Sequence, residues 1–236
     1  ASLKSASEII SETDDKNQSV KDLNHLEAEF FFPFLAHSPM EPLNCIIEPT
    51  KNGVRFYDGC QNPSGVQWAS SYILGLQPQQ IEVKTIYAGG SFGRRNSPAV
   101  KDLYQAEAAI AFALLGKKTP VKLVWDREDD IRGGYYRPMA FHKTKIGLDA
   151  KGKILRWDHR IATKSISKGT DFEKFLVHNG VDHFSVEGCV DTLYQLPNMS
   201  VGLSDFKSSI PVLWWRGVGH THTAYAMESL LDMVAQ

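Results

Sequence analysis

The most constraining feature of this sequence is a glycine-rich turn between a strand-like segment and a helical one. Residues 81–87 alternate apolar and polar side chains, which is typical of a β-strand. Three glycines then occupy five positions, at Gly89, Gly90 and Gly93. From Pro98 apolar residues recur at helical spacing as far as Leu115. The chain therefore has to turn from a strand into a helix through backbone conformations that glycine adopts most easily.

The chemistry of this turn points to an anionic ligand. Converging backbone N–H groups and a following helix N-terminus favour negative charge. Arg94 and Arg95 follow at once, and a guanidinium can bind phosphate with two hydrogen bonds. The turn lacks the Gly-Lys-Ser/Thr ending of a P-loop and the spacing of a dinucleotide fingerprint. Two interpretations stay open: a site for a phosphate-like anion, or a tight turn with solvated arginines.

A second unusual segment precedes the last helical pattern. Residues 214–222 contain two tryptophans, an arginine, two glycines and two histidines. A loop that leads into a helix N-terminus is a natural place for a polar ligand. His220 and His222 diverge at the start of a helix, so capping and packing explain them better than metal ligation. We predict no metal site in this chain.

Two further polar segments have structural interpretations. In residues 37–42 two prolines stiffen a turn, and His37 with Glu41 is interpreted as a buried hydrogen-bonded pair. Residues 126–130 form a run of charges, whose ordinary interpretation is a solvated surface.

The remaining pattern mixes strands and helices irregularly, which predicts an α+β fold with mixed sheets, hairpins and packed helices. The expected strands cover 26–34, 43–48, 54–57, 121–125, 141–148, 154–163 and 200–206. The expected helices cover 63–74, 98–115 and 220–234, with a short helical turn at 127–131. Residues 165–190 show no clear pattern. We predict a polar N-terminal arm (1–24), a first α/β part (25–134) and a second part (135–236).

Charge and cysteine content exclude several classes of protein. The 236 residues carry 26 Lys and Arg against 27 Asp and Glu, so no basic field exists to bind nucleic acid. The longest apolar stretch, 106–115, is broken by Glu107 and is too short for a membrane span. The three cysteines lack the paired spacing of a zinc ribbon or an iron–sulfur loop, and a disulfide framework is not expected either.

The ends of the chain suggest a piece of a longer protein. The sequence begins Ala-Ser-Leu-Lys, and it stops at Gln236 within an apolar helical pattern that has no capping signal. The alternative is a small protein with a processed start and a frayed last helix.

Five motifs, taken in order, resemble one known family. They are His37-x-x-Met40-Glu41-Pro42, Gln61-Asn62-Pro63, Gly89 to Arg95, Arg127-Glu128-Asp129 and Trp215 to His220. Their order and forms resemble the molybdenum-binding large subunit of the xanthine oxidase/aldehyde oxidoreductase family of molybdenum hydroxylases. They are most similar to the isoquinoline 1-oxidoreductase β-subunit branch. The resemblance implies the fold of the first part of an aldehyde oxidase-type molybdenum cofactor-binding domain, with the second half of that domain missing.

The resemblance also implies a function for the full-length parent. The parent would hydroxylate a ring carbon of an N-heteroaromatic compound, or oxidise an aldehyde, at a molybdenum–molybdopterin centre with water as the oxygen source. The cofactor is expected in its cytosine dinucleotide form. Electrons would leave through a small iron–sulfur partner subunit with two 2Fe-2S clusters. Localisation stays open between the periplasm, after twin-arginine export, and the cytoplasm.

Site residues follow from the matching motifs. Gln61 matches the glutamine that hydrogen-bonds the apical oxo group of the cofactor, and Phe92-Gly93 matches the pair beside that group. Arg216 matches the arginine of the second cofactor loop. The remaining cofactor-binding residues of the two motifs are Gly89, Gly90, Ser91, Arg94 and Gly217.

Departures from the family pattern concern the substrate and the catalytic base. Asn96 stands where purine-oxidising members carry a glutamate, and Val218 stands where an aromatic residue often packs on the substrate. Both are assigned to the substrate pocket, and purine is disfavoured as the substrate. The family's catalytic glutamate is expected downstream of Gln236, so we assign no catalytic residue here. The isolated fragment is expected to be inactive and to lack the cofactor. The alternative function is a small non-catalytic anion- or nucleotide-binding module built on the 89–95 loop.

Overall fold

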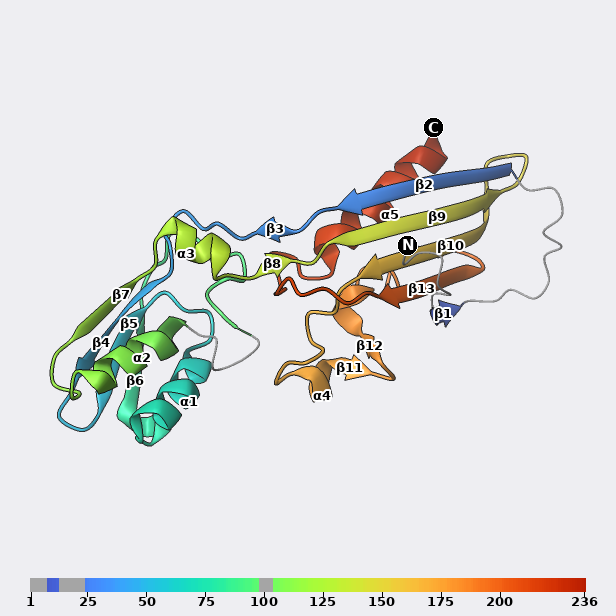
Figure 1. The fold of residues 1–236 in the computed structure, drawn as a ribbon. Coiled ribbons are helices and arrows are strands. Elements are labelled where there is room, and N and C mark those ends of the chain that lie inside the picture. Colours follow the sequence, from blue (N-terminus) through green and yellow to red (C-terminus); the bar gives the residue numbers. More distant parts are fainter. Residues whose placement is uncertain (1–7, 13–23, 98–103) are drawn as a thin grey trace. The chain divides into compact units, whose positions relative to one another are not determined.

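The computed structural model describes residues 8–12, 24–97 and 104–236. The chain forms two compact units (Figure 1). We call Ala36–Tyr136 the glycine-loop unit, and Ala1–Leu35 together with Arg137–Gln236 the long-sheet unit. The α+β class with mixed sheets is confirmed.

The glycine-loop unit consists of a four-stranded sheet covered by two helices on one face (Figure 1). The strands lie in the order β6-β5-β4-β7. Their bounds are β4 Asn44–Pro49, β5 Val54–Asp58, β6 Ile81–Thr85 and β7 Val121–Val124. The helices are α1 Pro63–Leu74 and α2 Tyr104–Leu114. The predicted hairpin of β4 and β5 is confirmed, and β6 pairs parallel to β5 because α1 carries the chain back across the sheet.

Local signals place α1 where the sequence predicts it. The Asn62 side chain caps the helix by accepting a hydrogen bond from the Gly65 backbone N–H at 3.0 Å. Pro63 occupies the first turn, and Gly75 ends the helix in the left-handed conformation (φ 66°). The helix expected from 98 is described from Tyr104 onward, and residues 98–103 lie outside the described residues.

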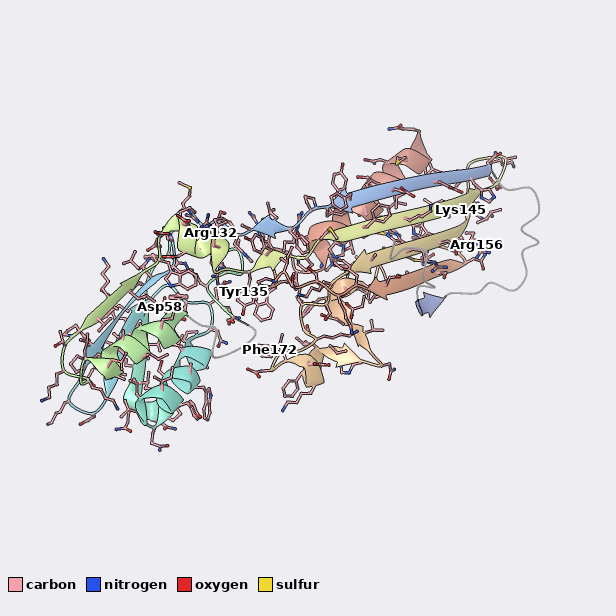
Figure 2. The ribbon with its side chains drawn as sticks, viewed as in Figure 1. Asp58, Arg132, Tyr135, Lys145, Arg156 and Phe172 are labelled. Atoms are coloured by element: carbon pink, nitrogen blue, oxygen red, sulfur yellow. The ribbon has the colours of Figure 1, made fainter. Side chains whose placement is uncertain are left out.

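The core of the glycine-loop unit lies between the sheet and the helices. Its buried members include Leu43, Cys45, Ile47, Phe56, Leu74, Ile81, Ala108 and Phe112. One carboxylate is buried with them: Asp58, labelled in Figure 2, accepts hydrogen bonds from the Tyr104 hydroxyl at 2.5 Å and from the Gln105 amide. Burial raises the pKa of Asp58, and these two hydrogen bonds oppose the effect.

The long-sheet unit is built on a five-stranded sheet in the order β1-β13-β10-β9-β2. The strands are β1 Glu8–Glu12, β2 Asn24–Phe32, β9 Ala140–Leu148, β10 Ile154–Thr163 and β13 Met199–Asp205. The predicted hairpin of β9 and β10 is confirmed, while β10 and β13 are parallel. Helix α5, His220–Ala235, packs on one face of the sheet through Met227 and Leu230. Figure 2 shows Lys145 of β9, which pairs with Glu27 of β2 at 3.1 Å.

Short elements complete both units. They are β3 Leu35–Ala36, η2 Pro78–Gln80, α3 Arg127–Arg132, β8 Tyr136–Arg137, α4 Glu173–Leu176, β11 Val177–His178, β12 Val181–Asp182 and η4 His183–Ser185. The unpatterned segment 165–190 is organised by Asp182, whose buried carboxylate accepts hydrogen bonds from the Ser165 hydroxyl (2.6 Å) and the Ser167 backbone N–H (2.9 Å). Such side chain–backbone bonds leave no periodic signal in a sequence.

The two units differ from the sequence-based parts at the N-terminal side. The division expected at 134/135 lies close to the one between Tyr136 and Arg137. The division expected at residue 25 is replaced by one at Leu35/Ala36, because β2 pairs with β9 along its whole length. Within the expected arm 1–24, residues Glu8–Glu12 form β1 and pair with β13. Residues 1–7 and 13–23 of that arm lie outside the described residues.

Candidate functional site

The glycine loop connects β6 to the segment before α2, and several of its residues have unusual backbone conformations. Gly90 and Gly93 have φ values of 100° and 105°, and Phe92, a residue with a Cβ, has φ 58°. Gly89 is required for another reason: a Cβ there would lie 2.6 Å from the Cβ of Glu41. The motif therefore encodes a fixed backbone shape and a close approach between two segments.

Gln61 and the glycine loop are brought together by two hydrogen bonds. The Gln61 backbone N–H donates to the Arg95 carbonyl at 3.1 Å, and the Ser91 hydroxyl donates to Gln61 Oε1. Asn96 accepts hydrogen bonds from the Ser97 backbone N–H at 2.9 Å and from the Asn62 amide at 3.4 Å. The side chains of Gln61 and Phe92 are exposed, so they are available to a ligand.

The buried side chain of Arg95 holds the glycine loop in place through hydrogen bonds. This side chain is 1% exposed, and it donates to the Gly90 carbonyl (2.9 Å), the Glu41 carbonyl (3.0 Å) and the Glu41 carboxylate (3.1 Å). The Glu41 carboxylate also accepts from the Gly89 backbone N–H and from Asn44. These hydrogen bonds, with the Gly89 bond first, hold the pKa of Glu41 below its usual value. Glu41 of the Met-Glu-Pro motif therefore fixes the glycine loop.

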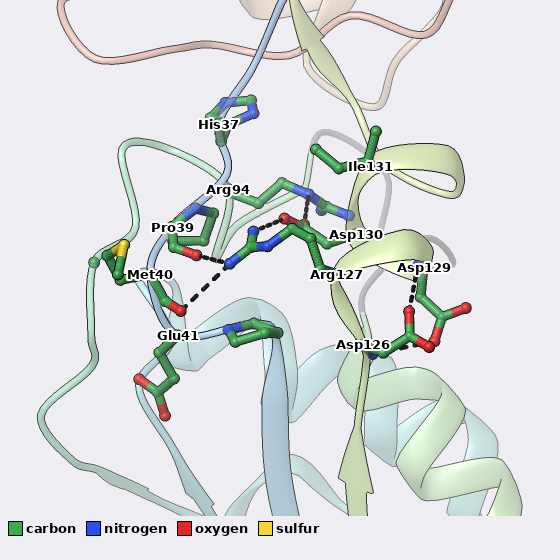
Figure 3. A network of polar contacts seen from close by, with 12 residues as sticks. His37, Pro39, Met40, Glu41, Arg94, Asp126, Arg127, Asp129, Asp130 and Ile131 are labelled. Atoms are coloured by element: carbon green, nitrogen blue, oxygen red, sulfur yellow. Dashed lines mark hydrogen bonds and ion pairs between the residues drawn. The ribbon is translucent and has the colours of Figure 1, made fainter.

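Arg94 is buried in a second charged cluster, shown in Figure 3. Its guanidinium lies 3.2 Å from Asp130 and stacks over the rings of Trp125 and Tyr135. Arg127 approaches the same carboxylate at 2.8 Å and donates to the Pro39 carbonyl. The cluster thus links α3 to the segment that carries Glu41.

Three sequence-based interpretations are corrected by these contacts. Arg94 and Arg95 are neither solvated nor turned to an anion, because both guanidinium groups are buried and already engaged, Arg94 by Asp130 and Arg95 by Glu41. The charge run 126–130 is only partly solvated, since Asp130 is 4% exposed. The expected pairing of His37 with Glu41 is replaced by other contacts: His37 Nδ1 lies 3.3 Å from the Tyr135 carbonyl, and the Glu41 carboxylate binds Gly89 and Arg95.

The second candidate loop lies in the long-sheet unit and leads into α5. Arg216 is exposed, Gly217 has φ 89° and Val218 has φ 50°. A β-branched residue rarely occupies this region, so Val218 marks local strain. The Val218 backbone N–H donates to the Trp215 carbonyl at 2.7 Å, and Gly219 N–H donates to the Glu187 carboxylate at 3.0 Å. These hydrogen bonds hold the turn that presents Arg216.

A buried chain of imidazoles lies at the start of α5 and was not predicted. His159 Nε2 lies 2.7 Å from His142 Nδ1, and His142 Nε2 lies 2.9 Å from His222 Nδ1. The indole N–H of Trp157 can only donate, and it points to His159 Nδ1 at 3.4 Å. The chain therefore runs in one direction with each histidine neutral and protonated at Nε2.

Burial keeps these histidines neutral. It lowers the pKa of His159 to about 3 and that of His222 to about 4, and it lowers the pKa of His142 as well. Sequence reasoning singled out only His222, because its two partners lie on β9 and β10, far away in the sequence. The one available signal was the inward position of both histidines on strands with a clean alternation.

A small cavity lies against this loop within the long-sheet unit. Its volume is about 10 Å³, and its lining includes Trp214, Trp215, Val218, Phe184 and His222. This volume admits one group the size of a water molecule. Across residues 8–12, 24–97 and 104–236, no group of three or more His, Cys, Asp or Glu is arranged to hold a metal ion. In the same ranges no helix has the length and apolar character to cross a membrane.

The sequence-predicted site residues thus form two sets. Gln61, Gly89, Gly90, Ser91, Phe92, Gly93, Arg94 and Asn96 gather in the glycine-loop unit, whereas Arg216, Gly217 and Val218 share one turn of the long-sheet unit.

Comparison with known proteins gives a family match over nearly the whole chain. The model of the molybdopterin cofactor-binding domain matches residues 4–236. Among curated proteins, the isoquinoline 1-oxidoreductase subunit β of Brevundimonas diminuta is 28% identical over 201 residues, covering 84% of this chain and 25% of the relative. The nicotine 6-hydroxylase large subunit of Paenarthrobacter nicotinovorans is 25% identical over 94% of this chain and 27% of the relative. The chain spans about a quarter of the length of these two relatives.

Solved structures show the same fold. Quinoline 2-oxidoreductase from Pseudomonas putida 86 superposes with a TM-score of 0.72 at 19% identity, covering 98% of this chain and 29% of the other. The aldehyde oxidoreductase from Desulfovibrio gigas gives a TM-score of 0.68 at 17% identity, covering 98% of this chain and 24% of the other.

Proposed function

The chain belongs to the family of molybdopterin cofactor-binding domains, and from this premise we propose that it is the first cofactor-holding part of a molybdenum hydroxylase large subunit. The parent enzyme would hydroxylate a carbon of an N-heteroaromatic ring. This chain would supply cofactor contacts, and the catalytic glutamate would lie outside it.

The observation that carries the proposal is the exposed amide of Gln61 beside a glycine loop whose arginines face inward. Arg94 and Arg95 are buried against carboxylates and carbonyls, so the surface of the loop is uncharged backbone. A phosphate site would expose those guanidinium groups. An uncharged amide donor beside a rigid backbone suits an oxo group instead, because neutral donors stabilise it without transferring a proton. The same burial disfavours the alternative of a small anion- or nucleotide-binding module.

The residues present fit a molybdenum–pterin group. We assign to its binding Gln61, the Gly89–Gly93 backbone with Ser91 and Phe92, and the turn of Arg216 and Gly217. Arg216 is exposed and cationic, which suits an anionic cofactor. When bound, the group supplies two-electron redox chemistry and the oxygen-transfer centre. The cytosine dinucleotide form is part of the proposal, while Arg94 is assigned to holding the loop.

The substrate class is proposed from the pocket residues and the relatives. Asn96 is uncharged and its carboxamide is held by Ser97 and Asn62, so it lacks the acidic group expected for purine oxidation. Val218 is smaller than an aromatic residue and leaves more room beside Arg216. Relatives named for isoquinoline and nicotine point to a nitrogen heterocycle. A relative named as an aldehyde dehydrogenase makes aldehyde oxidation the second candidate.

We propose a separate small subunit with two 2Fe-2S clusters as the electron acceptor. Such a partner would be encoded beside the parent gene and would copurify with the large subunit. A parent that transfers electrons without any iron–sulfur protein would contradict this assignment.

The test uses the full-length parent purified with its cofactor. Arg216→Ala is expected to lower molybdenum content several-fold, while Lys207→Ala, another exposed cation of the same unit, is the matched control. Gln61→Ala is expected to lower turnover of a heterocycle such as isoquinoline by about 100-fold. Unchanged metal content in Arg216→Ala together with unchanged turnover in Gln61→Ala would refute the site. For the 236-residue chain alone we expect far less than one molybdenum atom per chain, and a full equivalent would contradict that expectation.

A further inference from the structure

The orientation of the Gln61 carboxamide is determined by neighbouring hydrogen bonds. An amide side chain offers an acceptor on one side and two donors on the other, and rotation by half a turn exchanges them. The proposed role of Gln61 requires the NH2 group to face the ligand. The opposite orientation would turn the carboxamide oxygen toward the ligand.

Two hydrogen bonds of Ser91 select one orientation of the Gln61 carboxamide. Its Oγ accepts from the Arg95 backbone N–H at 3.3 Å, and its hydroxyl donates to Gln61 Oε1. With one lone pair engaged by Arg95, the hydroxyl proton needs an acceptor, and the Gln61 oxygen provides it. In the opposite orientation Ser91 Oγ would receive two N–H donors and its own proton would lose this acceptor.

The Ser91 hydrogen bonds form part of a closed ring. The Gln61 backbone N–H donates to the Arg95 carbonyl at 3.1 Å, so Gln61 is bound to the loop at both its backbone and its side chain. The buried side chain of Arg95 anchors that ring to Glu41 and Gly90. Within the described part of the chain, the Gln61 NH2 group has no hydrogen-bond partner, so both of its protons remain available.

We propose that Ser91 is a positioning residue, which fixes the Gln61 carboxamide with its oxygen toward the loop and its NH2 group toward the bound ligand. The identity of that ligand rests on the proposed function, whereas the orientation itself is a property of the chain. In this role Ser91 acts through Gln61 and not on the substrate.

The first experiment measures the motion of the Gln61 side-chain amide by ¹⁵N relaxation in the 236-residue chain. We expect an order parameter near that of rigid backbone, about 0.8, in the wild type and in Ser91→Thr. In Ser91→Ala it falls below about 0.6. Ser64→Ala, an exposed serine of the same region, is the matched control and leaves the value unchanged.

The Asn62 amide provides an internal reference, because its oxygen is held by Gly65 and not by Ser91. A loss of order at Gln61 with Asn62 unchanged supports the proposal. Equal changes at both amides would assign Ser91 to general support of the loop and overturn it. An unchanged Gln61 in Ser91→Ala overturns it as well.

The second experiment uses the loaded full-length parent. Ser91→Ala is expected to lower kcat about tenfold with KM nearly unchanged, and Ser91→Thr restores kcat. If Gln61→Ala leaves turnover intact, the proposed role of Gln61 at the cofactor fails while the relaxation result still stands. If Gln61→Ala lowers turnover but Ser91→Ala changes neither the order parameter of the Gln61 amide nor kcat, only the positioning role fails.

Discussion

The glycine loop and the turn before α5 have similar backbone conformations but are stabilised by different interactions. Each turns the chain sharply and holds a non-glycine residue in the left-handed region, Phe92 in one and Val218 in the other. The glycine loop is held by the buried ion pair of Arg94 with Asp130 and by the charged hydrogen bonds of the buried Arg95 side chain. The turn before α5 is held by a backbone hydrogen bond and a hydrogen bond to the Glu187 carboxylate, and the first turn of α5 carries His222 of the neutral histidine chain.

This difference determines what each loop is sensitive to. A buried ion pair is damaged most by removing one partner, because an uncompensated charge remains inside the protein. A neutral imidazole chain is damaged most by protonation, because burial opposes the charged form. The two loops can therefore be disturbed independently, and four predictions follow this contrast from the largest expected effect to the smallest.

Acidification should destabilise the long-sheet unit first. In the unfolded chain histidine takes up a proton below about pH 6.5, whereas folded His222 and His159 stay neutral down to about pH 4 and about pH 3. The unfolded state therefore binds more protons in this window, and stability falls as the pH falls. At pH 5 the loss is about 2 kcal/mol for each buried histidine.

Hydrogen exchange resolved by peptide at pH 7 and pH 5 measures this loss. In the glycine-loop unit the stabilising ionisation of Glu41 is lost only at lower pH, below the ordinary value of 4.5. His142→Gln should reduce the pH slope, while His25→Gln, at an exposed position, should not. Equal slopes in the two units would contradict the contrast.

Removing Arg95 should act on the glycine-loop unit. Arg95→Met leaves the carbonyls of Gly90 and Glu41 without their donor, and we expect a loss of about 3 kcal/mol in the free energy of unfolding. Urea unfolding measures it. Arg55→Met is the control, because Arg55 forms partly exposed ion pairs and should contribute less than about 1 kcal/mol. Similar losses in both variants would show that the burial of Arg95 is unimportant.

Neutralising Asp130 tests the buried part of the charge run. Asp130→Asn keeps the shape of the side chain but leaves Arg94 without its counter-charge, at a cost of about 2 kcal/mol. Glu128→Gln, in an exposed pair with Arg132 on the same short helix, should cost less than about 0.5 kcal/mol. Thermal unfolding of the two variants checks the difference, and a larger effect at Glu128 would reverse the assignment.

The smallest effect concerns the strain at Val218. Val218→Gly removes a β-branched residue from the left-handed region and so relieves backbone strain. This stabilising effect offsets the lost packing and the added entropy of the unfolded chain. We expect the free energy of unfolding to change by less than about 1 kcal/mol. The control is Val181→Gly, in the extended strand β12 and also partly buried, which should lose more than Val218→Gly. Equal losses in a chemical unfolding experiment would show that Val218 carries no strain.

The sequence predicted the helices and strands better than it predicted which of these segments pair with one another. Helix α1 matches its prediction because proline, asparagine and glycine act on neighbouring backbone groups. The hairpin of β9 and β10 matches because alternation and a turn are both local signals. The placement of β2 beside β9 was missed, because an alternating segment shows that a strand forms but not which strand it joins.

The roles of charged residues were the hardest to predict. Glu41 lies 54 residues before Arg95 in the sequence, and Arg94 lies 36 residues before Asp130. The residues next to Arg94 and Arg95 in the sequence therefore give no sign that the two arginines are buried. The histidine chain was missed for the same reason, since 80 residues separate His142 from His222.

The sequence by itself determined the order of the motifs, the family they resemble and the backbone freedom of the glycine loop. These properties reside in the type of each residue and in its spacing from near neighbours. Only the tertiary structure decided which polar groups stay available to a ligand. Burial and pairing depend on segments brought together from distant positions, and they turn Arg94 and Arg95 into supports while leaving Gln61 and Arg216 exposed.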